Sequence, residues 1–203
     1  MSSDVAAPRA GSLTRTGDAP VRRRMGAGRT VSACLRRQWP ALVLAALLWS
    51  AMVAVGYGEG LRGTDVVERE AVTVSGALWW EIFSNNAHIT LGLFSGLVCL
   101  GITTVLLTAT SATILGVLTA QAIGLVGPAQ FALGVGPHLV PEMAGFVLAT
   151  AAGLTSVVAV ARRIGGWSTR LAVGQVLRDA LVLQLLALVA LAIGATIETW
   201  VSA

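Results

Sequence analysis

Charged side chains are scarce in this sequence of 203 residues, of which 12% are charged and 55% are hydrophobic. A soluble globular domain has about 25% charged residues, so this composition predicts an integral membrane protein. Lysine is absent, and the 14 basic residues are all arginines. Only Cys34 and Cys99 could form a disulfide or a cysteine metal site. One precedes the first apolar run and the other lies inside a later one, which makes a disulfide improbable and excludes a cysteine cluster.

Motifs of several enzyme classes are missing as well. The sequence has two histidines, and they do not form the H-E-x-x-H pattern of zinc proteases. It has no G-x-x-x-x-G-K-[ST] loop for binding phosphates and no recognisable Ser-His-Asp set. We therefore expect no enzymatic activity, no bound metal and no cofactor.

The arginines are concentrated near the N-terminus. Eight of them precede Trp39: Arg9, Arg15, Arg22, Arg23, Arg24, Arg29, Arg36 and Arg37. Such a tail could bind nucleic acid, but a hydrophobic run follows it directly, and basic residues beside a span usually mark the cytoplasmic side. We expect no nucleic-acid partner. Residues 1–38 are predicted to be a disordered cytoplasmic tail, and residues 39–203 a membrane domain.

Apolar runs fill most of this membrane domain. One crossing of a bilayer needs about 20 mostly apolar residues. The sequence predicts an all-α polytopic bundle of about five spans, joined in the middle by a tight hairpin at Thr108–Thr113 and by a short re-entrant or interfacial segment at 129–136. The predicted spans are 40–57, 86–108, 112–126, 137–161 and 181–199.

Charge between the spans predicts their orientation. Residues 58–80 form a polar, acidic-leaning loop, and its second part could form a helix that lies on the membrane surface. Four arginines lie between the last two spans: Arg162, Arg163, Arg170 and Arg178. The positive-inside rule then predicts a multi-pass protein of the cell membrane, with its N-terminus in the cytoplasm and its C-terminus outside.

Six polar residues interrupt the apolar spans near their predicted outer ends: Asn85, Asn86, His88, His138, Glu142 and Glu198. Polar and ionisable groups inside a membrane usually face the bundle interior or water. The cluster could hydrogen-bond the helices together, line a conduit or substrate site, or receive a partner. Gly92 and Gly96 form a G-x-x-x-G pair, a pattern that favours close helix packing within one chain over packing between two chains of a dimer. The sequence leaves open whether the protein forms a homo-oligomer.

Three of these features together resemble a known family. An Asn pair (Asn85, Asn86) opens a glycine-rich span, a turn of Gly136, Pro137 and His138 leads to Glu142, and Glu198 closes the last span. In this order and spacing the chain resembles the stage II sporulation protein M family of bacterial membrane proteins. The resemblance covers about residues 80–200, and the turn with its glutamate is its most specific part.

The resemblance implies a role in a membrane complex. The founding member belongs to the complex that degrades peptidoglycan during engulfment, in which stage II sporulation proteins D and P act on the wall. We therefore expect a non-catalytic scaffold in the lipid bilayer that positions other membrane or cell-wall proteins. The alternative is a membrane component of a transport or export system, paired with a separate ATPase or acting in bacteriocin maturation or immunity, as some relatives imply.

The predicted orientation can be tested by chemical labelling. A cysteine introduced at Thr64 should react with a membrane-impermeant reagent in whole cells, whereas a cysteine at Ser168 should react only after lysis, because the arginines place that loop inside. Labelling at Ser168 without labelling at Thr64 would invert the topology.

Overall fold

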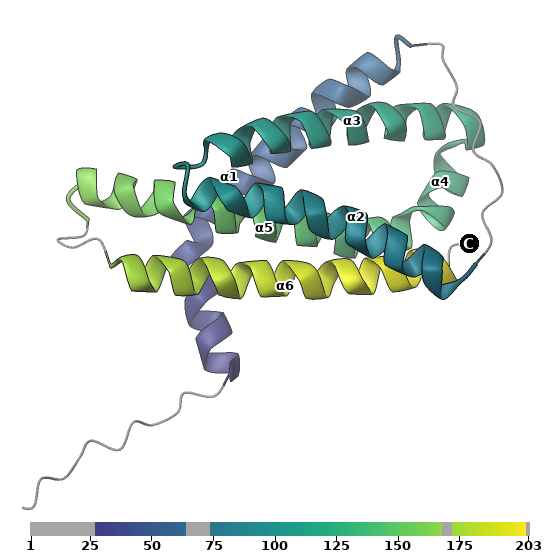
Figure 1. Ribbon diagram of the computed structural model, residues 1–203. Coiled ribbons are helices and arrows are strands. Elements are labelled where there is room, and N and C mark those ends of the chain that lie inside the picture. The colour runs from purple at the N-terminus through teal and green to yellow at the C-terminus, as the bar shows by residue number, and fades with distance from the viewer. Residues whose placement is uncertain (1–26, 64–73, 168–171, 202–203) are drawn as a thin grey trace, which may run out of the picture.

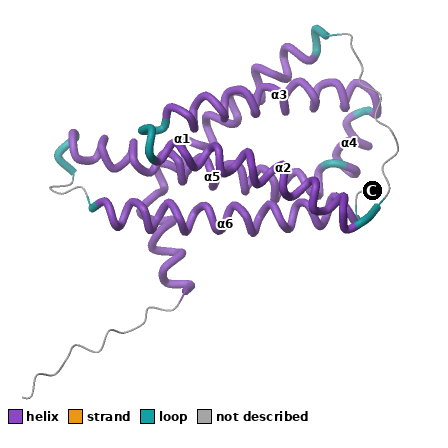
Figure 2. Tube along the Cα trace, viewed as in Figure 1, coloured by secondary structure: helices purple, strands orange, loops and turns teal. Residues whose placement is uncertain are grey.

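The computed structural model describes residues 27–63, 74–167 and 172–201, and within these ranges the backbone forms helices and turns and no strand (Figures 1 and 2). The all-α prediction is confirmed. Within the described residues, four helices, α1, α3, α5 and α6, are long and apolar enough to cross a membrane. The elements are α1 (Ala27–Gly60), α2 (Gly76–Phe94), the 3₁₀ turn η1 (Ser95–Leu97), α3 (Ile102–Val126), α4 (Pro128–Gly134), α5 (Gly136–Ile164) and α6 (Val173–Trp200).

The helices run between two ends of the bundle that differ in charge. At the first, here called the arginine end, α6 begins, α5 ends, and η1 connects α2 to α3, while α1 begins below α6 on this side of the bundle (Figure 1). At the second, here called the carboxylate end, α1, α3 and α6 end, α2 begins, and α4 leads into α5 (Figure 1). Helix α1 crosses the others obliquely, whereas α2, α3, α5 and α6 lie side by side.

Helix α5 occupies the centre and contacts α1, α2, α3, α4 and α6. Its middle is made of small residues, and Ala149, Ala151 and Ala152 are fully buried. The largest buried side chain is Trp49 of α1, which stacks on Phe146 of α5 with ring centroids 5.1 Å apart. The Trp49 indole donates a hydrogen bond of 2.8 Å to the Thr150 hydroxyl, so this ring is satisfied inside the core.

The predicted hairpin at Thr108–Thr113 is wrong, because that stretch lies inside the continuous helix α3. Small hydroxylated residues suit a helix here: Thr110 donates its hydroxyl hydrogen bond back to helix carbonyls, and Thr113 packs closely against α1. The chain instead turns at Leu100 and Gly101, both of which have positive φ, 47° and 79°. The predicted span 86–108 is thereby divided between α2 and α3.

Other predicted boundaries also change. Helix α1 begins at Ala27, so the part of the predicted tail from 27 to 38 is helical, while residues 1–26 lie outside the described residues. The surface helix expected before Phe83 corresponds to the start of α2 at Gly76, and residues 64–73 are outside the described part. The short segment expected at 129–136 is the seven-residue helix α4. Helices α5 and α6 extend beyond both ends of the predicted spans.

Glycines allow the helices to approach at backbone distance. A Cβ on Gly56 of α1 would overlap the backbone of Thr113, and one on Gly116 of α3 would overlap the backbone of Val53. These contacts pair α1 and α3 in parallel. Gly92 and Gly96 both face α3 of the same chain, Gly92 near Leu107 and Gly96 against Thr104, but Gly96 lies in η1 beyond the end of α2. Both residues therefore pack within the chain.

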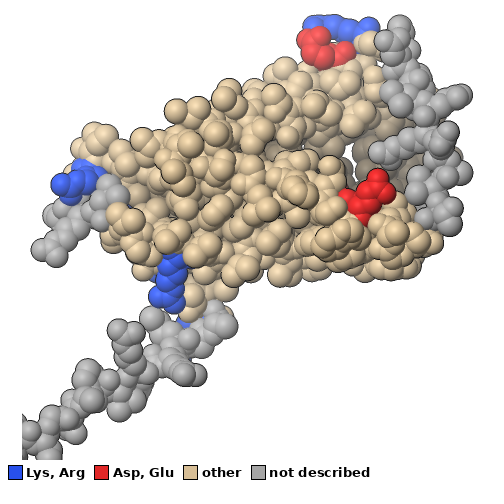
Figure 3. All heavy atoms as spheres, in the orientation of Figure 1, with Lys and Arg blue, Asp and Glu red and all other residues tan. Residues whose placement is uncertain are grey.

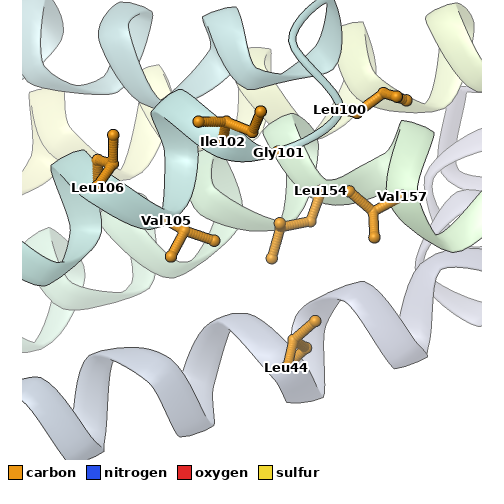
Figure 4. A pocket seen from close by; sticks show the side chains of 8 residues that line it. All are labelled: Leu44, Leu100, Gly101, Ile102, Val105, Leu106, Leu154 and Val157. Atoms are coloured by element: carbon orange, nitrogen blue, oxygen red, sulfur yellow. The ribbon is translucent and has the colours of Figure 1, made fainter.

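A shallow apolar groove of about 370 Å³ opens on the side of the bundle. Figure 4 shows α1 facing the α2–α3 turn, α3 and α5 across it. Its walls are almost entirely carbon, as expected for a surface that contacts lipid chains in a membrane. It is lined by Leu44, Leu100, Gly101, Ile102, Val105, Leu106, Leu154 and Val157.

The close contact at Gly96 predicts a measurable cost for one added methyl group. Gly96→Ala would place a Cβ against Thr104, whose hydroxyl is buried and donates a 2.7 Å hydrogen bond to the Leu93 carbonyl. We expect a loss of about 1–3 kcal/mol of stability from overpacking. Gly124→Ala is the control, because nothing lies within 4 Å of that position in α3.

Melting in detergent compares the two variants. The control should melt at or above the parent temperature, since alanine is the better helix former. If the Gly96→Ala protein melts at the same temperature as the Gly124→Ala protein, η1 does not pack tightly on α3.

Candidate functional site

Three side chains of types that can ligate a metal meet at the carboxylate end. His138 and Glu142 lie one turn apart near the start of α5, and Glu198 lies near the end of α6. One ligand atom of each, an imidazole nitrogen and two carboxylate oxygens, lies within 4.8 Å of the others. We call these three residues the His-Glu cluster.

Neighbouring residues hold Glu142 in this position. Asn86 of α2 donates a hydrogen bond of 3.1 Å from its Nδ2 to Oε1 of Glu142. On the other side is Gly194 of α6, where a Cβ would lie 2.5 Å from Cγ of Glu142. Because Gly194 has no side chain, the glutamate can lie across α6, and Glu198 follows one helical turn later. The three helices α2, α5 and α6 are therefore joined at this point.

Two of the six predicted polar residues do not join this group. Asn85 and His88 are exposed on α2, together with Glu81, which lies on the same helical face because positions 81, 85 and 88 follow the spacing of helical turns. His88 donates from Nδ1 to the carbonyl of Ser84 at 2.7 Å, so it is bonded within its own helix. The face at positions 81, 85 and 88 therefore points outward, and Asn86 is the residue that turns toward α5.

A second polar cluster, at the arginine end, was not anticipated from the sequence. Asp179 of α6 is 1% exposed and accepts two hydrogen bonds from Arg37 of α1, at 3.0 Å from Nε and 2.7 Å from Nη2. It also accepts from Gln38 at 3.0 Å and from Gln175 at 2.6 Å. Arg162 of α5 donates to the backbone carbonyl of Arg37. Four donors thus satisfy one buried carboxylate, and three helices meet there.

The sequence carried a signal for this second cluster. Asp179 is a lone acid between the arginines and the last apolar run, and Gln175 precedes it by one helical turn. The predicted disordered tail includes Arg37 and gives it no fixed partner. Because α1 begins at Ala27, Arg37 lies instead on a helix that places it beside Asp179.

Between the clusters the bundle is closed mainly by apolar side chains and threonines, together with the buried amide of Gln184, which donates a hydrogen bond of 3.4 Å to the Thr90 hydroxyl. Helix α3 has no charged residue, and neither does α6 between Asp179 and Glu198. The polar contacts of this middle region are short-range bonds between neutral groups, such as Thr108 with Thr150 at 3.2 Å. Fixed charge is therefore confined to the two ends in the described residues.

A sequence model of the family described as stage II sporulation protein M matches residues 40–203. This match covers most of α1 and every later helix. The chain belongs to the stage II sporulation protein M family. Comparison with curated proteins and with solved structures produced no match.

Membership in the stage II sporulation protein M family, together with four span-length helices, makes this a sporulation-related membrane protein. Apart from the exposed Asn85, the polar side chains on which the resemblance was based converge in space. The turn at Gly136 and Pro137 starts α5 and places His138 and Glu142 on its first two turns, and Asn86 and Glu198 reach the same point. For this family member, the His-Glu cluster is the candidate functional site.

The buried ion pair predicts unequal effects for two similar substitutions. Asp179→Ala removes the acceptor shared by Arg37, Gln38 and Gln175, and we expect it to cost about 2–3 kcal/mol of stability. Glu59→Ala removes the ion pair between Glu59 and Arg62, whose side chains are 58% and 76% exposed. This substitution should lower the stability by about 0.5 kcal/mol.

Thermal melting in detergent is the measurement, with yield of the membrane fraction as a second one. Equal melting temperatures for the two variants would mean that the contact between α1 and α6 contributes no stability.

Proposed function

We propose that this protein is a non-catalytic membrane scaffold that positions other membrane or cell-wall proteins. The observation that carries the proposal is the distribution of charged groups. They gather at the two ends of the bundle in the described residues, while the centre holds Trp49, Phe146, fully buried alanines and uncharged polar side chains. Such a molecule offers two chemically distinct ends to partners and a rigid body between them.

The closed centre favours a scaffold over a conduit. A path for ions or polar solutes needs polar groups or water along its length. Here the stacked rings of Trp49 and Phe146 lie between the His-Glu cluster and Asp179, and the neighbouring threonine hydroxyls are engaged in hydrogen bonds. A sideways opening exists at the groove near Leu44, but its walls are apolar.

Charge favours one orientation of the scaffold in the membrane. Six of the described arginines lie at the arginine end: Arg29, Arg36, Arg37, Arg162, Arg163 and Arg178. At the other end lie Glu59, Glu81, Glu142 and Glu198, with Arg62. On the face drawn in Figure 3, acidic atoms appear at this end and not at the arginine end. The positive-inside rule then puts the arginine end in the cytoplasm. The His-Glu cluster would face the outside, where cell-wall enzymes act.

The partners that fit this proposal are wall-degrading membrane proteins of the kind represented by stage II sporulation proteins D and P. A scaffold leaves the chemistry to such partners, which agrees with the absence of protease and nucleotide-binding motifs from the sequence. Its own contribution is to hold the partners at one place in the membrane.

This function predicts that partners lose their position when the scaffold is removed. In the source organism, deletion of this chain should disperse a fluorescently tagged wall-degrading partner, and expression of the parent chain should restore its localisation. Glu59→Ala removes only an exposed ion pair with Arg62, so this variant should restore the localisation of the partner as well as the parent chain does. Glu142→Ala disrupts the junction of α2, α5 and α6 and should restore it less.

Membrane abundance of each variant is followed in parallel, so that loss of protein is not mistaken for loss of function. Normal partner localisation and wall remodelling in the deletion strain would refute the scaffold role. Wall cleavage by the purified chain alone would refute the non-catalytic part.

A further inference from the structure

The His-Glu cluster has a composition that a pure structural clamp does not require. One imidazole and two carboxylates converge from α5 and α6, and the Asn86 amide already satisfies Oε1 of Glu142. Imidazole nitrogen together with carboxylate oxygen is a donor set suited to divalent transition metals such as Zn²⁺. The three residues also come from two rigid helices and not from a loop, which fixes their spacing.

The balance of charge points to the same ligand. Glu142 and Glu198 are both partly buried, and their carboxylate oxygens approach within 4.8 Å. Like charges at this distance repel, and in a membrane bundle the cost is higher than in water. The described arginine at this end, Arg62, forms a 2.6 Å ion pair with Glu59. A divalent cation between the two carboxylates would compensate both charges at once.

Geometry allows the three donors to close around one ion. Zn²⁺ binds nitrogen and carboxylate oxygen at about 2.0–2.2 Å, which puts neighbouring ligand atoms of a tetrahedral site about 3.4 Å apart. The side chains would have to move by about 1 Å from their present spread of up to 4.8 Å. Glutamate side chains can do this by rotation about their terminal bonds, while Cγ of Glu142 stays packed against Gly194.

We propose that His138, Glu142 and Glu198 form a binding site for a divalent transition metal ion of the Zn²⁺ class. Asn86 orients Glu142 from outside the coordination shell, as hydrogen-bonded partners of metal ligands commonly do. Three protein ligands leave a fourth position for water or for a group from a partner. The ion would tie the start of α5 to the end of α6. The proposal is independent of the scaffold function.

The site could not be found from a linear motif. The zinc-protease pattern places two histidines on one helix, whereas here the third donor is a glutamate on a different helix. The other histidine, His88, is exposed and bonded to the Ser84 carbonyl on α2, away from the cluster. His88 and the exposed Glu81 therefore supply matched controls for a histidine and a carboxylate in the same protein.

The test is direct metal binding by the full chain. The protein is purified in detergent without a polyhistidine tag, stripped with EDTA and titrated with Zn²⁺ by calorimetry. We expect one ion per chain and a melting temperature that rises with Zn²⁺ but not with an equal concentration of Mg²⁺, which prefers oxygen ligands in octahedral geometry. Co²⁺ in place of Zn²⁺ should give the intense visible absorption of a tetrahedral site.

Variants locate the ion. His138→Asn and Glu198→Gln should each weaken Zn²⁺ binding at least tenfold, since even an outer partner of a metal ligand commonly contributes 10–100-fold. His88→Ala and Glu81→Gln should change it less than twofold. Each variant is first melted in EDTA, so that a folding defect is seen separately from a binding defect.

Several results would overturn the proposal. They are less than one Zn²⁺ per parent chain, an equal response to Mg²⁺, or His88→Ala weakening binding as much as His138→Asn. If a cluster variant does not fold, the stoichiometry and the Co²⁺ spectrum of the parent and of the His88→Ala protein still decide the matter.

Discussion

Close approach of helix backbones is the constraint on which this bundle depends. Helices in lipid gain little from hiding apolar surface, so they associate through van der Waals packing and hydrogen bonds. The chain meets this requirement with residues that have small or no side chains at the crossings: Gly56 and Gly116 between α1 and α3, and Gly153 against Leu93 of α2. Alanines fill the centre of α5. Because the helices are this close, short side chains such as Thr104 can reach a carbonyl of a neighbouring element.

The two polar ends follow from the same packing. Both junctions bring together α6, α5 and one further helix, which is α2 at the His-Glu cluster and α1 at Asp179. A charge buried at such a junction is tolerated only if its partners are already in place. At Asp179 the partners are visible as four N–H donors. At the His-Glu cluster Asn86 supplies one donor to Glu142, and a bound cation would compensate the remaining negative charge. The two ends therefore differ in the chemistry of their polar groups as well as in the sign of their net charge.

Much of this architecture could be predicted from the sequence, because composition and long apolar runs indicate membrane helices without reference to tertiary structure. Both ends of α5, the end of α6 and the short α4 lie near the predicted positions, whereas α6 begins at Val173 and not near 181. The hairpin was misplaced because a Thr- and Ser-rich stretch was interpreted as a turn. Whether such residues end a helix depends on the surface that packs against them, here Gly56 of α1. The left-handed Leu100 carried no turn-forming signal of its own.

The candidate site, too, could be predicted from the sequence only in part. The convergence of Asn86, His138, Glu142 and Glu198 followed from topology, since all four lie near span ends on one side. Asn85 and His88 were expected with them. Adjacent residues on a helix point in different directions, so Asn86 faces α5 while Asn85 faces outward. Asp179 was missed because its partner Arg37 lies at the other end of the sequence.

The distance in sequence between Arg37 and Asp179 affects the order in which the protein can assemble during synthesis. The two residues are 142 positions apart, so α1 is synthesised long before its carboxylate partner exists. While the ribosome produces α2 to α5, the Arg37 guanidinium has only water, lipid headgroups or other proteins to contact. The ion pair that ties the start of α1 to the bundle can form only after Asp179 of α6 has emerged, so the last helix of the chain completes the anchoring of the first.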